Sequence, residues 1–290
     1  MMKKIACLFL TMSLMAFSTT YAQVCIDASR DAGFFAAGFA DGVPTFTVNN
    51  LGAHTHVPVG QANNDRVNRS VFDFDIAGNV PPGSTVTDVV FEFEVTQQGG
   101  IQGMNSVDFS LHRVTTAWDE GTGTGNIGNA TGDGVTWANA TAATMWTTLG
   151  GDFDAMTSGT VLVNGPNSFG GEPPETFSIT SAKLIQDVQD IVNGTTNYGF
   201  LLKADPEGLM GSASRVTSRE GGNAAKLIIT FSGDVLIGDI NMDGDVNLLD
   251  VAPFVDLIST GTFQAEADIN DDGDVNLLDV AGFVELLAGG

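Results

Sequence analysis

Cysteine is scarce in this sequence, which has only Cys7 and Cys25 among its 290 residues. Cys7 lies in an N-terminal segment with the features of a removable export signal. The mature chain would then keep a single thiol, so no intramolecular disulfide can form. Stability must therefore come from a hydrophobic core or from bound metal ions.

Basic residues are also few. The chain has 11 Lys and Arg against 35 Asp and Glu, which gives a formal net charge of −24. Such a polyanion repels phosphate and anionic lipid, which excludes nucleic acid and membrane surfaces as natural partners. Charged residues make up only 16% of the chain and hydrophobic residues 43%, as in a packed globular protein rather than a disordered acidic one.

Long apolar runs are missing beyond the N-terminus, and a membrane-spanning helix needs about 20 such residues. The first residues are basic, Ile5 to Phe17 is apolar, and small side chains stand at Thr20 and Ala22. This pattern predicts a secretory signal peptide over residues 1–22 that is cleaved after Ala22. We therefore expect a soluble, secreted protein with no membrane span.

Motifs of catalysis are lacking as well. The sequence contains no G-x-S-x-G nucleophile elbow, no phosphate-binding P-loop and no H-E-x-x-H zinc motif. Gly123 to Gly128 matches G-x-G-x-x-G, but it lies in a Gly/Thr/Asn loop and opens no helix, which excludes dinucleotide binding. His54 and His56 have no third metal ligand nearby in the sequence. A nucleophilic enzyme is therefore not indicated.

The acidic residues that are present concentrate at the C-terminus. Leu227 to Gly290 contains 13 Asp or Glu and no Lys or Arg. Within it, D-I-N-M-D-G-D-V-N-L-L-D at residues 239–250 recurs as D-I-N-D-D-G-D-V-N-L-L-D at residues 268–279, offset by 29 residues. So close a repeat indicates two copies of one structural unit.

Each copy of the repeat has the pattern of a calcium-binding loop. Oxygen-bearing side chains stand at positions 1, 3, 5, 9 and 12, glycine stands at position 6, and the Asp at position 7 would contribute its backbone carbonyl. We predict two Ca²⁺ sites. The candidate ligands are Asp239, Asn241, Asp243, Asp245, Asn247 and Asp250 in the first loop and Asp268, Asn270, Asp272, Asp274, Asn276 and Asp279 in the second.

An apolar segment follows each loop, Leu248 to Ile258 and Leu277 to Leu287. The helical spacing of their apolar residues predicts two short amphipathic helices that pack face to face. Pro253 requires the first helix to begin late or to kink. The predicted contact residues are Val251, Phe254, Val255 and Ile258 on one helix and Val280, Phe283, Val284 and Leu287 on the other.

Two loop-helix repeats, closed by Asp and with no helix before the first loop, resemble a type I dockerin over residues 234–290. The resemblance implies calcium-dependent folding and attachment to a cohesin domain. Dockerins often carry a Ser/Thr pair before the closing Asp, whereas this chain has Leu248-Leu249 and Leu277-Leu278. A cohesin-like partner or another, more apolar protein partner is therefore expected.

Residues 23–233 form the larger predicted domain. Apolar and polar residues alternate over Val71 to Ile76, Val89 to Val95 and Val107 to Leu111, and Gly-rich turns separate these segments. One helix is predicted at Ser181 to Val192. The expected fold is mainly β, an antiparallel jelly-roll β-sandwich with one short helix, followed by the small all-α module.

Several segments of this domain resemble the DNRLRE-type β-sandwich, which is related to carbohydrate-binding modules of secreted bacterial polysaccharide-degrading proteins. The segments include N-R-S-V-F-D-F-D at 68–75, L-H-R-V-T-T-A-W-D-E at 111–120 and S-R-E at 218–220. The resemblance implies polysaccharide binding by an extracellular bacterial protein.

Trp118, Trp137 and Trp146 are candidates for stacking on sugar rings. Arg66 and Arg69, together with Arg113, Arg215 and Arg219, could pair with uronate carboxylates. The alternative is that each Trp fills the core and each Arg neutralises an internal acid, such as Asp73, Glu120 or Glu220.

Three functions remain open at this point. The first is a secreted, non-catalytic protein that binds polysaccharide or matrix and attaches to a partner. The second is a polysaccharide lyase or glycoside hydrolase, which needs only two carboxylates. The pairs Asp73/Asp75 and Glu92/Glu94 meet that need, although their alternation is typical of a solvent-facing strand. The third is a structural or adhesive surface protein.

Overall fold

The computed structural model describes residues 21–40, 43–61, 65–99, 105–125, 133–166, 172–232, 236–270 and 272–289. Most of the predicted signal peptide, residues 1–20, lies outside these ranges. The chain divides into two compact units, one of which holds Val24–Ile76 and Val86–Ile229. None of the helices described has the length and apolar character needed to cross a membrane.

The strands form one curled antiparallel sheet, in the order β1-β12-β6-β11-β4-β5-β10-β7-β8. In addition, β2 pairs with β3 and β5, and β9 pairs with β6. The bounds are β1 Tyr21–Asp27, β2 Arg30–Ala40, β3 Val43–Asn50, β4 His56–Gln61, β5 Val67–Asp73, β6 Thr85–Gln98, β7 Val107–Arg113, β8 Gly159–Val163, β9 Glu175–Ile179, β10 Phe200–Asp205, β11 Ser214–Thr217 and β12 Lys226–Ser232.

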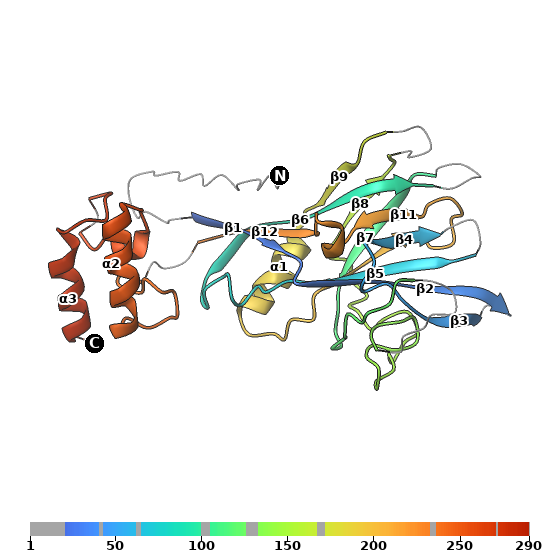
Figure 1. Ribbon diagram of the computed structural model, residues 1–290, viewed down its shortest axis with the longest axis horizontal. Helices are drawn as coiled ribbons and strands as arrows, with labels where there is room; N and C mark the ends of the chain where they lie inside the picture. The colour runs from blue at the N-terminus through green and yellow to red at the C-terminus, as the bar shows by residue number, and fades with distance from the viewer. Residues whose placement is uncertain are drawn as a thin grey trace. The chain divides into compact units, whose positions relative to one another are not determined.

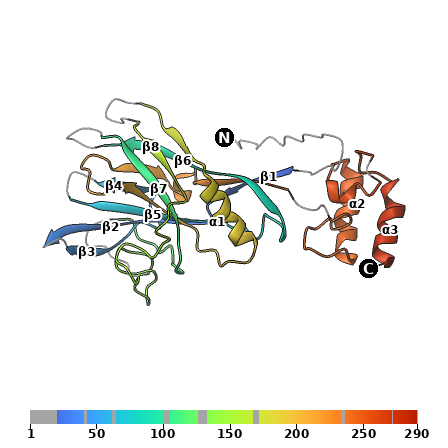
Figure 2. The same ribbon diagram turned by 180° about the vertical axis from the view of Figure 1, so that it is seen from behind.

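Strand β4 joins the two halves of the sheet. From His56 to Val59 it pairs with β11, whereas Gly60 and Gln61 pair with β5. Because the strand changes partner along its length, the sheet curls instead of continuing flat. Figures 1 and 2 show the strands from both sides.

Phenylalanine side chains fill one part of the sheet's interior. Phe91 and Phe93 on β6 are buried, and the intervening Glu92 and Glu94 are partly exposed, as period-2 alternation predicts. The ring centroids of Phe91 and Phe72 are 5.6 Å apart, and the Phe91 ring also contacts the ring of Phe93. Burial of each Phe contributes roughly 1.5–3 kcal/mol, so this alternation holds the sheet together.

Helix α1 spans Ala182–Val192, as the sequence predicted. Its N-cap is Ser181, whose side chain accepts a hydrogen bond from the Leu184 N–H. Leu184, Val188 and Ile191 are buried, and Gln189 on the partly exposed side accepts a bond from the Val86 N–H of β6. The helix is therefore tied to the strands beside which Figure 2 shows it.

The C-terminal elements are short helices: η3 Leu248–Asp250, α2 Val251–Thr260, η4 Ala265–Ala267 and α3 Asp279–Gly289. Helix α2 begins three residues later than the apolar pattern does, and Pro253 lies in its first turn, where no intrahelical N–H is required. A further short helix, η2 Arg219–Gly221, precedes β12. The predicted mainly-β class with a helical C-terminal module is confirmed.

The contact between α2 and α3 is narrower than predicted. Phe254 and Phe283 meet with ring centroids 4.4 Å apart, and Ile258, Val280 and Leu287 pack around them. In contrast, Val251, Val255 and Val284 are exposed, the last two by 59% and 56%. Their predicted place in the contact was wrong, because two isolated short helices bury only a narrow stripe against each other.

Candidate functional site

The first acidic loop is held by two buried aspartates. Asp239 is 5% exposed, and its carboxylate accepts hydrogen bonds from the N–H groups of Asp243 (3.0 Å) and Gly244 (2.9 Å). Asp250 is fully buried. Its Oδ1 accepts from the N–H groups of Ile240 (2.7 Å) and Asn241 (2.9 Å), and its Oδ2 accepts from Asn247 (2.8 Å). The first and twelfth loop positions thus organise the backbone between them.

The second loop repeats these bonds. Asp268 accepts from the N–H groups of Asp272 (3.1 Å) and Gly273 (2.9 Å), and Asp279 accepts from Ile269, Asn270 and Asn276. Asp268 is 6% exposed and Asp279 is fully buried. The repeat seen in the sequence is therefore also a repeat of structure.

Side chains at positions 1, 3 and 5 hold the turns within each loop by accepting hydrogen bonds from backbone N–H groups. The Asn241 Oδ1 accepts from the Asp243 N–H at 2.9 Å, and the Asp243 Oδ1 accepts from the Asp245 N–H at 3.0 Å. Gly244 and Gly273 have φ of +93° and +88°, a conformation that side chains disfavour. This explains the glycine at position 6 of both copies.

The buried carboxylates of the two loops have no cationic partner among the residues that the structure describes. Each loop holds four of the predicted Asp ligands, and no Lys or Arg occurs between Leu227 and Gly290. Within the described part of the chain, no ion pair involves Asp239, Asp250, Asp268 or Asp279. Buried charge needs compensation. A donor set made of oxygen alone is what a hard divalent cation such as Ca²⁺ prefers.

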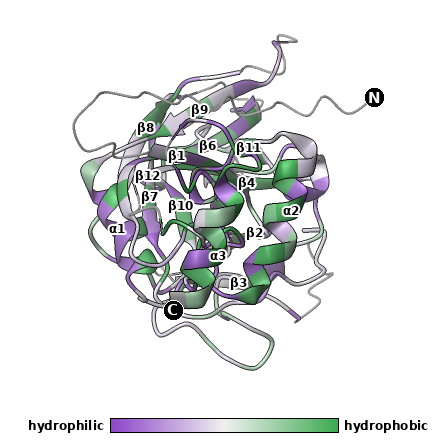
Figure 3. Ribbon diagram, turned by 90° about the vertical axis from the view of Figure 1, so that its left-hand side faces the viewer, coloured by the Kyte–Doolittle hydropathy of each residue, from purple (hydrophilic) through white to green (hydrophobic). Residues whose placement is uncertain are grey.

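Exposed leucines accompany the loops. Leu248 and Leu249 are 79% and 67% exposed, and Leu277 and Leu278 at the equivalent positions are 76% and 69% exposed. Hydrophobic residues also mark much of α2 and α3 in Figure 3. Large exposed apolar side chains at equivalent positions of both repeats indicate a surface for a protein partner.

All three tryptophans lie in the interior of the sandwich. Trp118, Trp137 and Trp146 are 1%, 7% and 4% exposed and pack with Phe34 and other core residues. The indole N–H of Trp118 donates to the carbonyl of Tyr198 at 2.8 Å, so its polar group is also satisfied. The tryptophans occupy the positions that the core-packing alternative expects.

Arg69 is fixed from several sides. Its guanidinium forms a bidentate pair with Glu207, both bonds 2.7 Å long, and lies over the rings of Trp137 and Phe153, with its Cζ 4.5 Å and 5.5 Å from their centroids. Its Nη1 donates to the Gly150 carbonyl at 2.7 Å. All three nitrogen atoms of this guanidinium therefore donate hydrogen bonds within the protein.

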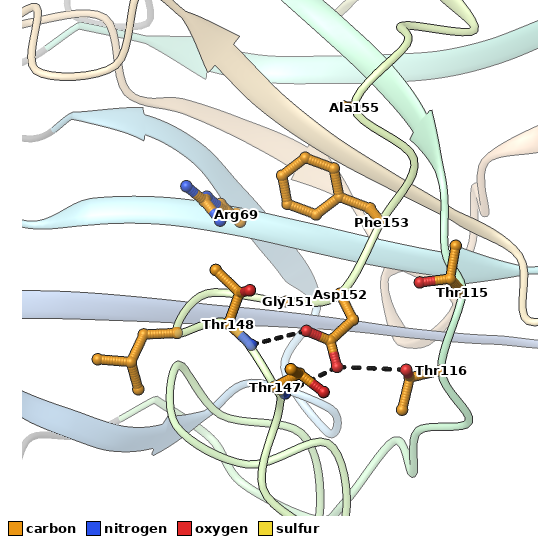
Figure 4. A pocket seen from close by; sticks show the side chains of 10 residues that line it. Arg69, Thr115, Thr116, Thr147, Thr148, Gly151, Asp152, Phe153 and Ala155 are labelled. Carbon is orange, nitrogen blue, oxygen red and sulfur yellow. Dashed lines mark hydrogen bonds between the residues drawn. The ribbon is translucent and has the colours of Figure 1, made fainter.

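A hollow of about 450 Å³ opens beside Arg69, lined by threonines, Phe153 and Asp152 (Figure 4). The Asp152 carboxylate accepts from the N–H groups of Thr147 (2.8 Å) and Thr148 (2.7 Å). Burial would raise the pKa of Asp152, but these hydrogen bonds lower it below its ordinary value. The carboxylate therefore stabilises the turn at Thr147 and Thr148, which lines the hollow.

A second hollow, of about 290 Å³, has a different chemistry. Arg66, Arg215, His54, His56 and Phe35 are among its lining residues, and no Asp or Glu that the structure describes lines it. The guanidinium of Arg66 lies over the Phe35 ring at 4.8 Å, and neither arginine forms an ion pair with any described residue. In a protein of net charge −24, this is a locally cationic concavity.

Burial shifts the two histidines of this hollow towards their uncharged form. Their rings meet edge to face, with centroids 4.1 Å apart. Burial lowers the pKa of His56 to about 4, and the charges of His54 and Arg215 lower it further in the same sense. Burial also lowers the pKa of His54. The positive charge of the hollow therefore comes from Arg66 and Arg215.

Other charged residues of the sandwich neutralise one another. Arg219 pairs with Glu120 and Glu220, both at 2.9 Å, as the alternative of internal neutralisation expects. Asp73 pairs with Arg30 at 2.9 Å, a partner that sequence reasoning missed because 43 residues separate the two. The hollow around Arg215 was missed for the same reason.

Comparison with models of known protein families identifies a dockerin type I domain at residues 237–283. The match contains both acidic loops, all of α2 and the start of α3. Dockerin domains bind calcium and imply a cohesin-type protein partner. No curated protein matches the chain.

Proposed function

We propose that the protein is a secreted, non-catalytic binding protein. Its dockerin domain would hold two calcium ions and attach the chain to a protein partner, while the β-sandwich would bind polysaccharide. One observation supports the calcium module: each loop buries two carboxylates that form no ion pair with any residue the structure describes. The proposed architecture is a signal peptide over 1–22, a binding domain over 23–233 and a calcium module over 234–290.

The proposed calcium ligands are oxygen atoms of the two twelve-residue loops. Side chains at positions 1, 3, 5, 9 and 12 would supply five of them, and the backbone carbonyl at position 7 a sixth, which is the coordination number that Ca²⁺ accepts. The proposed ligands are Asp239, Asn241, Asp243, Asp245, Asn247 and Asp250, and at the second site Asp268, Asn270, Asp272, Asp274, Asn276 and Asp279.

Chelation tests this proposal on the full chain. Without calcium the buried carboxylates repel one another, and binding free energy is folding free energy in such modules. In EDTA we expect hydrogen–deuterium exchange to rise throughout residues 239–289 and to stay slow in β5, β6 and β10. The double variant Asp239→Ala/Asp268→Ala should exchange in the same way even in calcium.

Asp256→Ala is the matched control for this experiment, because Asp256 is an exposed aspartate of α2 outside both loops. It should leave the exchange rates and their dependence on calcium unchanged. Slow exchange of both loops in EDTA would show that the loops are not structural calcium sites.

The hollow around Arg66 and Arg215 is the proposed contact for polysaccharide. Two guanidinium groups without a carboxylate partner among the described residues match a sugar that carries an anionic group. Pro58 adds apolar surface to the lining, while the buried Phe35 ring supports the Arg66 guanidinium from below. The buried tryptophans would support this site through the core rather than contact the sugar.

Affinity electrophoresis in gels containing polygalacturonate, dextran sulfate or neutral dextran tests the sandwich. We expect retardation by an anionic polymer, and a weakening of at least tenfold in Arg66→Ala and Arg215→Ala. Lys226→Ala removes a positive charge outside the hollow and should behave like the wild type. Retardation by none of the three polymers would count against the polysaccharide role, and release of sugar products would favour the hydrolase or lyase alternative.

A further inference from the structure

A second cluster of carboxylates lies in the sandwich, apart from the dockerin loops. Asp31 near the start of β2, Glu120 in the segment after β7, and Glu220 in η2 can each place an oxygen within 4.8 Å of the others. Arg219 lies among them. Its Nη2 is 2.9 Å from both Glu120 Oε2 and Glu220 Oε1, and its backbone N–H donates to Asp31 Oδ2 at 2.7 Å.

The charges of this cluster do not balance. With Asp31 ionised, three carboxylates face one guanidinium among the described residues, which leaves two negative charges over. Arg30, which precedes Asp31 in the sequence, pairs with Asp73 at 2.9 Å. Two uncompensated charges in a partly buried site are the charge complement of a divalent cation.

The hydrogen bonding of the cluster is incomplete as well. Asp31 is fully buried, and its Oδ1 has no hydrogen-bond partner among the described residues, although its Oδ2 accepts from Arg219. Glu120 cannot supply a donor, and its own Oε1 already accepts from the Asp31 N–H at 2.9 Å. A buried carboxylate oxygen without a partner costs free energy, and a cation or a proton at this position would remove that cost.

We propose that Asp31, Glu120 and Glu220 bind a hard divalent cation, with Asp31 Oδ1 as its most buried ligand. The donors are all oxygen, with neither histidine nor cysteine, which favours calcium over zinc or copper. Water would complete the coordination. The ion would join three segments that are far apart in sequence, and it would therefore stabilise the sandwich independently of the dockerin loops.

The electrostatics of Asp31 agree with this site. Burial raises the pKa of Asp31 to about 7, and the charges of Glu220 and Glu120 add to that rise, whereas the bond from Arg219 opposes it. The raised pKa by itself favours a proton on Asp31 and does not distinguish that proton from a bound cation. The competing explanation is a proton on Asp31 without any metal, and the experiment has to separate the two.

Equilibrium dialysis of the full chain against calcium separates them by stoichiometry. We expect Asp31→Asn and Glu220→Gln each to bind one calcium fewer than the wild type. Glu207→Gln is the matched control, because Glu207 also pairs with an arginine and its side chain is 24% exposed against 26% for Glu220. It should bind as many ions as the wild type. Equal numbers in all four proteins would overturn the proposal.

A thermal measurement keeps the proposal testable even where the variant of the buried residue, Asp31→Asn, does not fold. In the Asp239→Ala/Asp268→Ala background, calcium should raise the melting temperature of the sandwich, followed by tryptophan fluorescence, and Glu220→Gln should abolish that rise. Since Glu220 is partly exposed, this variant keeps the core even where Asp31→Asn does not. A melting temperature that calcium leaves unchanged in this background would also overturn the proposal.

Discussion

At the scale of single residues, charge pairing separates the arginines of the sandwich into two groups. Arg69 and Arg219 are bound to glutamates, whereas Arg66 and Arg215 face a hollow without an ion-pair partner among the described residues. The sequence shows only that arginine is rare in a polyanion. Which arginine is structural and which is available to a ligand depends on neighbours more than a hundred residues away, such as Glu207 for Arg69.

Arg69→Lys tests the structural group. A lysine cannot reproduce the bidentate bond to Glu207 or the stacking on Trp137, so we expect a loss of about 1–2 kcal/mol in the free energy of unfolding. Urea denaturation followed by tryptophan fluorescence measures it. Arg215→Lys, at a residue without an ion pair in the described structure, should stay within about 0.5 kcal/mol of the wild type. Equal losses in the two variants would contradict this assignment.

The pH dependence of the sandwich should reflect His56. Its folded pKa of about 4 lies below the ordinary histidine value of 6.5, so protonation favours the unfolded chain. This contribution to stability is complete above pH 6.5 and is lost as the pH falls towards 4. The difference in unfolding free energy between wild type and His56→Asn should therefore shrink over that interval. A difference independent of pH would show that His56 titrates normally.

At the scale of elements, two short helices are stabilised by a few aromatic contacts and by the loops before them. Neither α2 nor α3 exceeds 11 residues, a length that is marginal in isolation. Phe254 and Phe283 supply the central contact. Asn247 and Asp250 form a capping box at the N-terminus of η3, so the same aspartate serves the acidic loop and the helix that follows it.

Phe254→Ala should uncouple the two helices. Removing a buried phenyl ring costs roughly 3–5 kcal/mol. Because calcium binding and folding are coupled in such modules, we expect an apparent calcium affinity at least about 100-fold weaker in a chelator competition assay. Val255→Ala is the neighbouring control, since Val255 is 59% exposed, and it should change the affinity less than threefold. Similar affinities for both variants would contradict the proposed packing.

At the scale of the whole molecule, the chain combines a β-rich domain with a dockerin domain. The net charge of −24 is distributed accordingly. Among the described residues, the carboxylates of the C-terminal repeat form no ion pair, whereas in the sandwich Asp73, Asp154, Asp187, Glu120, Glu207 and Glu220 pair with arginine or lysine. The two proposed interaction surfaces are the exposed leucines of the dockerin and the arginine hollow of the sandwich.

The exposed leucines should govern attachment. Leu248→Ser/Leu277→Ser removes two large apolar side chains that contribute little to folding, because they are 79% and 76% exposed. Binding to a purified cohesin domain in calcium, measured by calorimetry, should weaken at least tenfold. Phe263→Ser, at an apolar residue 52% exposed outside both loops, should bind like the wild type. Unchanged affinity of the double variant would exclude these leucines from the contact.

Much of the fold and of one site could be predicted because the signals are local. The twelve-residue repeat contains all its proposed ligands, and β6 and α1 follow from periodicities of 2 and 3.6 residues. The width of the α2–α3 contact could not be predicted, because the apolar spacing of one helix does not determine what fraction of its apolar face the other helix buries. The tryptophans were ambiguous for the same reason, since burial depends on what packs against each ring.

The sequence by itself determined the mainly-β class, the C-terminal repeat and the candidate calcium loops, since each depends on residues within a dozen positions of one another. Only the tertiary structure decided that the tryptophans are buried, that Arg66 and Arg215 share a hollow, and that Asp31 meets Glu120 and Glu220. These sites are assembled by strand pairing between distant segments, and the spacing of residues along the chain does not specify which segments pair.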